Sequence, residues 1–258
     1  MPFPNTPEKI SFQSTLNAKQ VFAARMQSKK IGTINSPQGV IFLYQNSLIK
    51  HIKKKHKLSR KSSIFFGDYY TLTGINGGVG LISNFGIGSP VTAVLVEELA
   101  AWGVKNFILV GLAGALDERL RSAALVVCDR TIRDEGTSHH YLPPGRLANP
   151  SPHLTKKLSK NLTAMGIKHK IGGSWTTDAP YRETHEEILA YRREGILTVE
   201  MEAAALFAVS QTLGLNSAAA FAIGDAYNGQ SWTIDFDHAK ITGSLLQLFD
   251  AALRSLTS

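Results

Sequence analysis

Residues 79–110 read VGLISNFGIGSPVTAVLVEELAAWGVKNFILV, and this stretch decides the fold class. Two apolar runs of strand length, 79–83 and 106–110, enclose a segment whose apolar residues have helical spacing. A helix is predicted over 89–102, because Ser89 is a favourable N-cap and the proline after it suits the first helical position. A strand, a helix and a second strand in direct succession are typical of α/β proteins, in which helices pack on a sheet.

The same alternation continues on both sides of this stretch. Further strands are predicted over residues 39–44, 63–66, 69–73, 123–128, 167–171, 196–199 and 218–223. Further helices are predicted over 18–27, 47–58, 154–165, 184–194, 202–213 and 237–256, with a long loop over 133–152. We therefore expect a single three-layer α/β domain over residues 38–258, with a central mixed β-sheet flanked by helices and an N-terminal extension over 1–37. In sheets of this kind the ligand lies beyond the carboxyl ends of the strands.

The positive charge of the chain is concentrated near its beginning. The 258 residues carry 28 Lys and Arg against 20 Asp and Glu, a formal net charge of +8. Residues 1–70 hold 12 of the bases but only two of the acids, so the rest of the chain is slightly acidic. The lysines of 50–61 are interpreted first as a solvated helix face, second as an anion site at a subunit contact, and third as a nucleic-acid surface. A nucleic-acid partner is not expected, because no aromatic residues are interleaved with these lysines to stack on bases.

The composition argues against several other classes of protein. A hydrophobic content of 43% is that of a globular protein, and no apolar run approaches the roughly 20 residues of a membrane-spanning helix. The polar N-terminus has no signal-peptide core. The single cysteine, Cys128, allows neither an intramolecular disulfide nor a cysteine-based zinc cage. We expect a cytoplasmic protein without a membrane partner.

Three unusual segments follow predicted strands. Asn84-Phe-Gly-Ile-Gly-Ser-Pro90 joins a strand to a helix, so its glycines let the backbone approach an anion at the helix start, or simply form a tight turn. Val110-Gly-Leu-Ala-Gly114 is a second glycine turn. The segment 133–141 holds an Arg, two acids and two His, but adjacent loop histidines seldom bind one ion together, and no metal site is predicted. Cys128 lies in an apolar strand, where a thiol is usually inert.

Two later segments place carboxylates at strand ends. In Thr198-Val-Glu-Met-Glu-Ala-Ala-Ala205 a strand enters a helix, and a buried Glu202 needs a hydrogen-bonding partner such as sugar hydroxyls. The alternative is an acid that the helix dipole favours at a helix start. In Ile223-Gly-Asp-Ala-Tyr-Asn-Gly229, Asp225 follows a buried strand, where apolar surroundings can keep a carboxyl protonated as a general acid. An Asx turn is the alternative there.

Taken in this order, the segments resemble those of the nucleoside phosphorylase superfamily, in particular its uridine phosphorylase-like and bacterial purine nucleoside phosphorylase-like branch. The matching pieces are Phe85-Gly-Ile-Gly-Ser-Pro-Val, the Val-Gly-x-x-Gly turn at 110–114, the segment 133–141, Val199-Glu-Met-Glu-Ala-Ala-Ala, and Gly224-Asp225. The resemblance covers residues 39–256, and the Val-Glu-Met-Glu-Ala motif is its most specific part.

The resemblance implies a phosphorylase-like fold and cleavage of the N-glycosidic bond of a purine or pyrimidine nucleoside by inorganic phosphate. The products would be a free base and a pentose 1-phosphate, with phosphate as co-substrate and no cofactor. By similarity, Glu202 would bind ribose hydroxyls and Asp225 would protonate or hydrogen-bond the base. The other implied substrate-binding residues are Glu200, Met201, Ala113, Gly114, Trp175, Thr177, Tyr181 and Arg182, and the implied phosphate-binding residues are Gly86, Gly88 and Ser89. A homo-oligomer, dimeric or hexameric, is also implied.

The chain departs from the family pattern around phosphate. The family loop of the type Gly-x-Pro-x-x-Arg is Tyr-Gln-Asn-Ser at 44–47, and leucines 109 and 112 stand where an Arg and a Ser or Thr are usual. Phosphate prefers Arg forks or several backbone donors. A nucleosidase that uses water is therefore kept as an alternative, beside a non-catalytic nucleoside binder and a basic nucleic-acid-binding protein. Asp225 favours a purine whereas 133–141 resembles the uridine branch, so the base stays open.

Overall fold

The computed structural model describes residues 4–29, 35–61, 65–74, 78–234 and 238–257. The strands are β1 (Gly39–Leu43), β2 (Leu58–Lys61), β3 (Asp68–Leu72), β4 (Val79–Ser83), β5 (Asn106–Ala115), β6 (Leu125–Asp134), β7 (Leu147–Ala148), β8 (Lys170–Thr177), β9 (Ile196–Glu200), β10 (Asn216–Tyr227) and β11 (Trp232–Ile234). The helices are α1 (Ala18–Ser28), α2 (Leu48–Lys55), α3 (Ser89–Trp102), α4 (Pro152–Ala164), α5 (His185–Arg193), α6 (Ala203–Thr212) and α7 (His238–Thr257). Short 3-10 turns are η1 (Pro7–Ser11), η2 (Ser138–His140) and η3 (Pro180–Arg182).

Within these described ranges the strands form one 11-stranded mixed sheet. The order is β11-β10-β6-β8-β9-β5-β1-β4-β3-β2, with β7 beside β6. The strand β10 also pairs in parallel with β5, so that β5, β10, β6, β8 and β9 close into a ring. The central strand β1 runs parallel to both β4 and β5. The ring brings the carboxyl ends of β5, β8 and β9 and the end of β10 close to one another.

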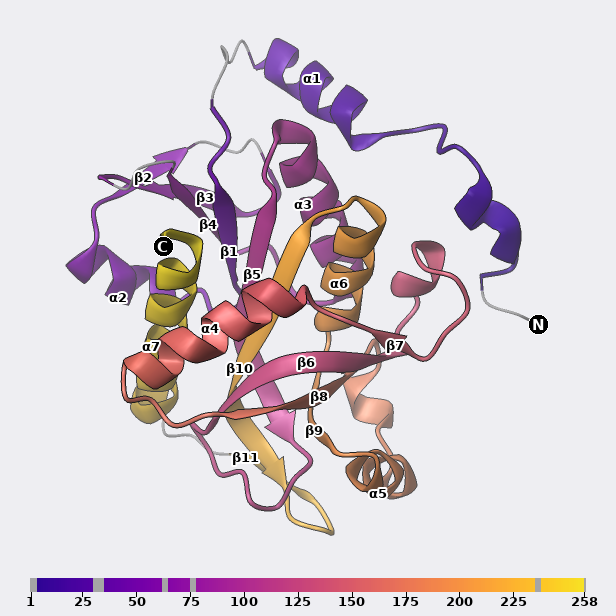
Figure 1. The fold of residues 1–258 in the computed structure, drawn as a ribbon, viewed down its shortest axis with the longest axis vertical. Coiled ribbons are helices and arrows are strands. Elements are labelled where there is room, and N and C mark those ends of the chain that lie inside the picture. The colour runs from indigo at the N-terminus through magenta and orange to yellow at the C-terminus, as the bar shows by residue number, and fades with distance from the viewer. Residues whose placement is uncertain (1–3, 30–34, 62–64, 75–77, 235–237, 258) are drawn as a thin grey trace.

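Helices cover both faces of the sheet, which gives three layers (Figure 1). The helices α3 and α6 pack together on one face, and α4 and α7 pack together on the other. Every residue of α6 from Ala203 to Ser210 is buried, and its alanines allow the helix to lie close to the sheet. The predicted three-layer α/β fold with a mixed sheet is confirmed.

The first helix belongs to the segment predicted as an extension, and it packs on α3. The Phe22 ring stacks near the Trp102 indole, with ring centres 6.4 Å apart. The Arg25 guanidinium donates two hydrogen bonds of 2.6 Å to the buried Glu98 carboxylate. These contacts hold α1 against the body of the protein.

Several predicted boundaries are wrong. The helix predicted over 47–58 ends at Lys55, and residues 58–61 form β2, because they pair antiparallel with β3. Of the strand predicted over 63–66, the first two residues lie outside the described residues and the last two form a bend. Residue 237 of the last predicted helix also lies outside the described part. The strands β5, β6, β8 and β10 continue past their predicted ends, because the polar and glycine-containing ends are paired within the ring.

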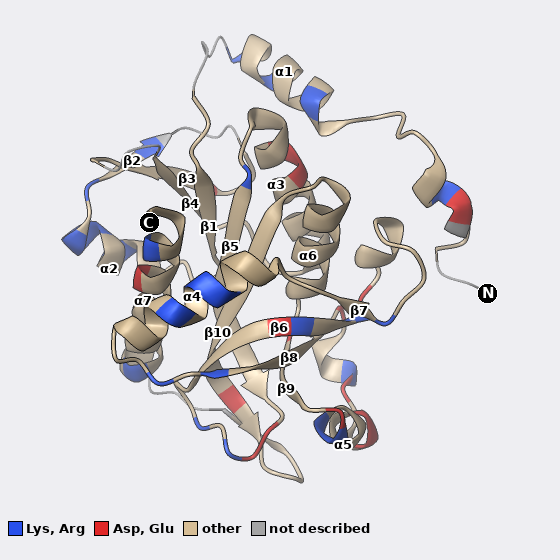
Figure 2. Ribbon diagram, in the orientation of Figure 1, with Lys and Arg blue, Asp and Glu red and all other residues tan. Residues whose placement is uncertain are grey.

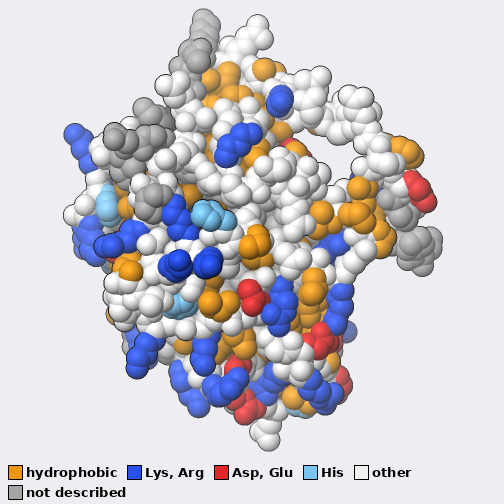
Figure 3. All heavy atoms as spheres, viewed as in Figure 1, with side chains coloured by type: hydrophobic (Ala, Val, Ile, Leu, Met, Phe, Trp, Pro, Cys, Tyr) orange, Lys and Arg blue, Asp and Glu red, His pale blue; other side chains and the backbone are white. Residues whose placement is uncertain are grey.

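The lysines of α2 lie on the surface. The helix buries Leu48, Ile49 and Ile52 and leaves its lysines exposed, as the spacing predicts. Figure 2 marks Lys and Arg positions in blue on α2 and α4, and Figure 3 shows blue side chains on this part of the surface. In the described ranges no helix is both long enough and apolar enough to cross a bilayer.

Candidate active site

A cavity of about 420 Å³ lies where the ends of β5, β8, β9 and β10 meet. Its wall consists of Leu112, Ala113, Gly114, Thr177, Pro180, Tyr181, Glu183, Val199, Glu200, Met201, Asp225 and Trp232. The residues predicted to bind substrate that lie on this wall are Ala113, Gly114, Thr177, Tyr181, Glu200, Met201 and Asp225. Side chains far apart in the sequence are thus collected at the strand ends, where a ligand is expected in an α/β sheet.

Glu200 joins the end of β9 to the start of α6. Its buried carboxylate accepts hydrogen bonds from the backbone N–H groups of Glu202 (2.8 Å) and Ala203 (2.7 Å). It also accepts hydrogen bonds from the hydroxyls of Thr176 and Ser174. Burial raises the pKa of Glu200, and these four donors oppose that rise. Because its oxygens are committed to the helix start and to β8, Glu200 fixes the geometry of the neighbouring Met201 and Glu202.

Glu202 is a buried carboxylate beside the cavity rather than on its wall. Its side chain is 7% exposed, and its Oε1 accepts a 2.7 Å hydrogen bond from the backbone N–H of Gly88. Burial, followed by the negative charge of Glu200, raises the pKa of Glu202 to about 8. The hydroxyl of Ser89 donates to the carbonyl of Met201 at 2.9 Å. The start of α3 and the end of β9 are thus tied together at two points.

The predicted phosphate loop is engaged within the protein. Gly86 and Gly88 have φ angles of 91° and 99°, which a residue with a side chain rarely adopts, so glycine is required at both positions. Of the expected phosphate donors, the Gly88 amide is bonded to Glu202, and the Ser89 hydroxyl is bonded to the backbone. Tyr44 stands where the family loop has other residues. Burial, followed by the nearby charge of Glu202, raises the pKa of Tyr44 well above its usual value.

Tyr44 is itself part of this network. Its hydroxyl donates to the hydroxyl of Thr92, which in turn donates to the carbonyl of Gly88 at 2.9 Å. The Tyr44 ring packs edge-on against Phe85, with centres 4.8 Å apart. No Lys or Arg belongs to the wall of the 420 Å³ cavity in the described part of the chain. The site therefore combines buried carboxylates with apolar side chains where cations are usual in the family that the sequence resembles.

Asp225 reaches the cavity because β10 is irregular at Gly224. The pairing with β5 steps from Ile223 opposite Ala113 to Asp225 opposite Gly114, which leaves Gly224 as an extra residue. Such a bulge changes the direction of the following side chain. Burial raises the pKa of Asp225. The carboxyl is thus held in conditions that favour its protonated form.

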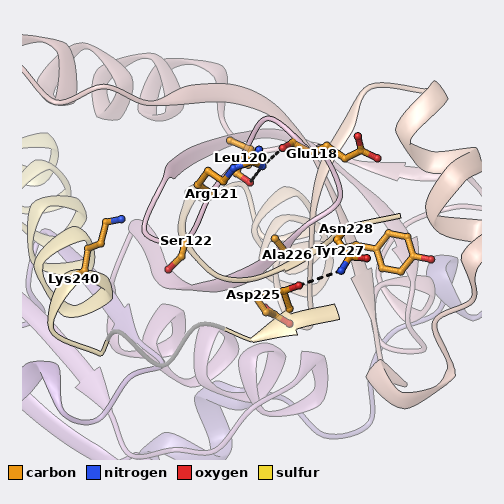
Figure 4. A pocket seen from close by; sticks show the side chains of 10 residues that line it. Glu118, Leu120, Arg121, Ser122, Asp225, Ala226, Tyr227, Asn228 and Lys240 are labelled. Atoms are coloured by element: carbon orange, nitrogen blue, oxygen red, sulfur yellow. Dashed lines mark hydrogen bonds between the residues drawn. The ribbon is translucent and has the colours of Figure 1, made fainter. Parts of the chain in front are cut away.

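A second cavity, of about 720 Å³, shares Asp225 with the first. Figure 4 shows Arg121 and Ser122 on the connection after β5, Lys240 on α7 across from them, Asp225 and Ala226 on β10, and Asn228 directly after that strand. The side-chain amide of Asn228 donates to the Thr233 hydroxyl at 3.3 Å, which links β10 to β11 at this edge. Asp225 therefore stands at the boundary between two cavities.

Trp175 does not lie where sequence reasoning predicted. The indole is 1% exposed, packs edge-on against Tyr191 at 4.8 Å and donates its N–H to Asp134 at 2.9 Å. It lies deeper along β8 than Thr177, under α5, and is a core residue that does not line the cavity. Trp175, which the resemblance implied as a substrate-binding residue, is therefore not on the wall of this cavity.

The aromatic wall of the cavity is Trp232 on β11. A Cβ at Gly114 would lie 2.7 Å from the Trp232 ring and 3.1 Å from a Val199 methyl group, so only glycine lets the indole lie against β5. The Trp232 ring also packs edge-on against Tyr227, with centres 5.7 Å apart. Trp232 was missed because a lone tryptophan in a polar stretch carries no strand pattern.

Of three consecutive residues before α5, two line the cavity and one does not. Tyr181 is fully exposed at the cavity rim, and Arg182 is exposed and not part of the wall. Glu183 does lie on the wall and was missed, because an acid just before a helix is ordinarily assigned to the helix start. Burial, followed by the charges of Asp225 and Glu187, raises the pKa of Glu183 to about 7.

The segment 133–141 organises a loop and holds no reacting group at the cavity wall. The Arg133 guanidinium donates to the Ser138 hydroxyl and to the carbonyls of Ser138, Leu142, Pro143 and Gly145. Cys128 is buried, its thiol donates to the Arg130 carbonyl, and burial raises its pKa well above the usual value, as expected for an inert thiol. Among the described residues no group of three or more His, Cys, Asp or Glu is arranged to hold a metal ion.

Comparison with known proteins places this geometry in a family. The profile of the Phosphorylase superfamily matches residues 35–254. The chain is 30% identical over 176 residues to uridine phosphorylase of Thermococcus kodakarensis, a match that covers 62% of each chain. It is 32% identical over 138 residues to guanosine phosphorylase of Halorubrum lacusprofundi, covering 54% of this chain and 57% of that relative. The matches thus span less than two thirds of the length of either relative.

Solved structures agree on the fold. The purine nucleoside phosphorylase of Toxoplasma gondii in complex with immucillin-H superimposes with a TM-score of 0.77, covering 86% of this chain and 91% of that one, at 20% sequence identity. The closed ring of strands and the helices on both faces are thus the architecture of a known fold, and the profile covers nearly all of the described domain. The chain belongs to the phosphorylase superfamily.

Proposed function

We propose that this chain cleaves the N-glycosidic bond of a nucleoside and transfers the pentose to inorganic phosphate. The observation that carries the proposal is the meeting of Met201, Asp225 and Trp232 on one cavity, with the buried Glu202 as the next residue after Met201. The named relatives, a uridine phosphorylase and a guanosine phosphorylase, support phosphate as the acceptor. No cofactor enters the proposed reaction.

The two ends of the cavity divide the chemistry between them. At the sugar end, the thioether of Met201 packs against the pentose and Glu202 accepts hydrogen bonds from its hydroxyls. At the base end, Trp232 supplies an apolar face for the base, and Asp225 donates a proton or hydrogen bond to it. A phosphate oxygen bonds to C1′ as the C1′–N bond breaks, and the electron pair of that bond stays on the base. Protonating the base neutralises the charge that develops on it.

Phosphate requires cations that the described cavity wall does not contain. We propose that they come from a second copy of the chain in a homo-oligomer, for which the exposed lysines of α2 are candidates. An assembly of this kind places the anion site at a contact between subunits.

Hydrolysis is the second candidate, and one observation favours it. The Gly88 amide and the Ser89 hydroxyl, two of the expected phosphate donors, are already hydrogen-bonded within the protein. With water as the acceptor, the water oxygen bonds to C1′ as the C1′–N bond breaks, and the proton that water loses passes to a proton-accepting group. The products are the free nucleobase and the free pentose. No phosphate site is then needed.

Product analysis separates the two candidates. Adenosine, inosine, guanosine and uridine are incubated with the protein with and without phosphate, and free base, pentose and pentose 1-phosphate are measured by chromatography. We expect base and pentose 1-phosphate, formed only with phosphate. Equal release of base with free pentose in both conditions would replace phosphorolysis by hydrolysis. Binding of a nucleoside without release of base would leave a non-catalytic binder.

A further inference from the structure

We infer that Glu183 acts on the base together with Asp225, and that this carboxylate pair selects a purine with an amino group beside a ring acceptor. The inference rests on the proposed function, since it assigns a residue and a substrate class to the same cavity. Both carboxylates belong to the wall of the 420 Å³ cavity, one from the turn after η3 and the other from β10.

Glu183 has no structural task that would explain its position. The start of α5 is capped without it, because the Thr184 hydroxyl accepts the Glu187 N–H and the Glu187 carboxylate accepts the Thr184 N–H at 3.1 Å. Within the described part of the chain, the Glu183 carboxylate takes part in no hydrogen bond or ion pair. A half-buried carboxylate without a partner is unfavourable unless a ligand or a proton satisfies it.

Glu183 and Asp225 are two carboxyl groups on the wall of one cavity, and the other charged groups named around Glu183 do not neutralise them. Asp225 approaches from β10, and Glu187 lies on α5, so both neighbouring charges are negative. His185, also on α5, is bonded through Nδ1 to the Tyr227 hydroxyl at 2.6 Å. No Lys or Arg of the described cavity wall offsets these charges. Two carboxyl groups in one apolar site bind a proton more readily than either would alone.

A pair with one proton offers one hydrogen-bond donor and a free carboxylate acceptor. The edge of adenine presents N7 as an acceptor beside the N6 amino group as a donor, and it matches this arrangement. A 6-oxopurine presents two acceptors, N7 and O6, at the same edge, so one of them would face an ionised carboxylate. The pair therefore favours 6-aminopurine nucleosides, with Asp225 and Glu183 contacting adjacent atoms of the base.

The test compares nucleosides and variants in one assay. We would measure kcat/KM for adenosine, inosine and uridine with the wild type, Glu183→Gln, and the matched control Glu186→Gln, which changes an exposed acid in the first turn of the same helix. The wild type should prefer adenosine. Glu183→Gln should lower kcat/KM for adenosine by about 100-fold, the lower range for a lost acid–base group. Its amide can donate to O6, so the adenosine-to-inosine ratio should shift at least about tenfold toward inosine.

The outcomes are distinguishable. A wild type that prefers inosine or uridine overturns the inference, as does a Glu183→Gln variant with the kinetics of Glu186→Gln. An equal loss for adenosine and inosine in Glu183→Gln, with unchanged thermal stability, also overturns it, because a general disturbance of the cavity would not change selectivity. In all these cases the proposed function stands. If the wild type releases base from no nucleoside, the proposed function itself fails.

Discussion

Replacing Gly114 by alanine tests the packing on which the cavity depends. The added Cβ would lie 2.7 and 2.8 Å from two atoms of the Trp232 ring and 3.1 Å from Val199 Cγ1. Non-bonded carbon atoms are not found as close together as the first two distances, so the indole or the end of β5 must move. Overpacking of this kind costs about 1–3 kcal/mol of unfolding free energy. For a chain of this size that is a fall in Tm of roughly 2–12 °C.

The same substitution should also impair activity, because Trp232 lies on the cavity wall together with Asp225. We expect kcat/KM for the preferred nucleoside to fall at least about tenfold, since misplacement of groups around a substrate by even a fraction of an ångström is costly. Gly243→Ala is the matched control. No atom lies within 4 Å of that Cβ, and alanine is favoured over glycine in a helix by up to about 1 kcal/mol. Calorimetry and a base-release assay on both variants decide the matter. If Gly114→Ala keeps wild-type Tm and activity, the indole does not lie against β5.

Three further predictions concern the groups around the site and the first helix. The folded protein holds a proton on Glu202 up to about pH 8, whereas the unfolded chain releases it near pH 4.5. The free energy of unfolding should therefore decrease as pH rises through this window, by up to about 1.4 kcal/mol per pH unit from this group. Glu202→Gln should reduce this dependence on pH. The measurement is urea denaturation at several pH values, and an unchanged slope in the variant would contradict the prediction. Arg25→Ala leaves the buried Glu98 carboxylate without its guanidinium partner, so the free energy of unfolding, measured by denaturation, should fall by about 3 kcal/mol. A fall below about 0.5 kcal/mol would show that the ion pair is not formed. Arg133→Met removes the donors that hold residues 138–145, so limited proteolysis should cut there faster than in the wild type, and equal rates count against that role.

The fold class could be predicted from the sequence because burial leaves a periodic trace. The apolar run of β1 and the apolar face of α2 are both buried in the structure, as their hydrophobic patterns predict. The ends of β5 and β10 left no such trace. Residues such as Gly114 and Asp225 resemble turn residues, yet they are paired in the closed ring, and only tertiary contacts determine that they are strands.

The site could be predicted in part for a similar reason. Residues that directly follow buried strands, such as Met201 and Asp225, were expected at the sheet edge and lie on the cavity. The sequence could not show which tryptophan lines the cavity. Trp175 is covered by Tyr191 of α5 and lies in the core, and this packing is decided by tertiary contacts alone. The unpaired state of Glu183 was equally hidden, since it depends on Thr184 and Glu187 capping the helix without it.

Cleavage of a nucleoside in the cavity at the ends of β5, β8, β9 and β10 is the activity proposed for this chain. The most direct measurement is the rate of base release in phosphate buffer by the wild type, by Asp225→Asn and by Lys168→Gln, an exposed lysine between α4 and β8 that does not line the cavity. We predict free base and pentose 1-phosphate from the wild type, the wild-type rate for Lys168→Gln, and a loss of at least about 100-fold for Asp225→Asn at unchanged Tm. Base release by Asp225→Asn at the wild-type rate, or no release by the wild type from any nucleoside, would contradict the claim.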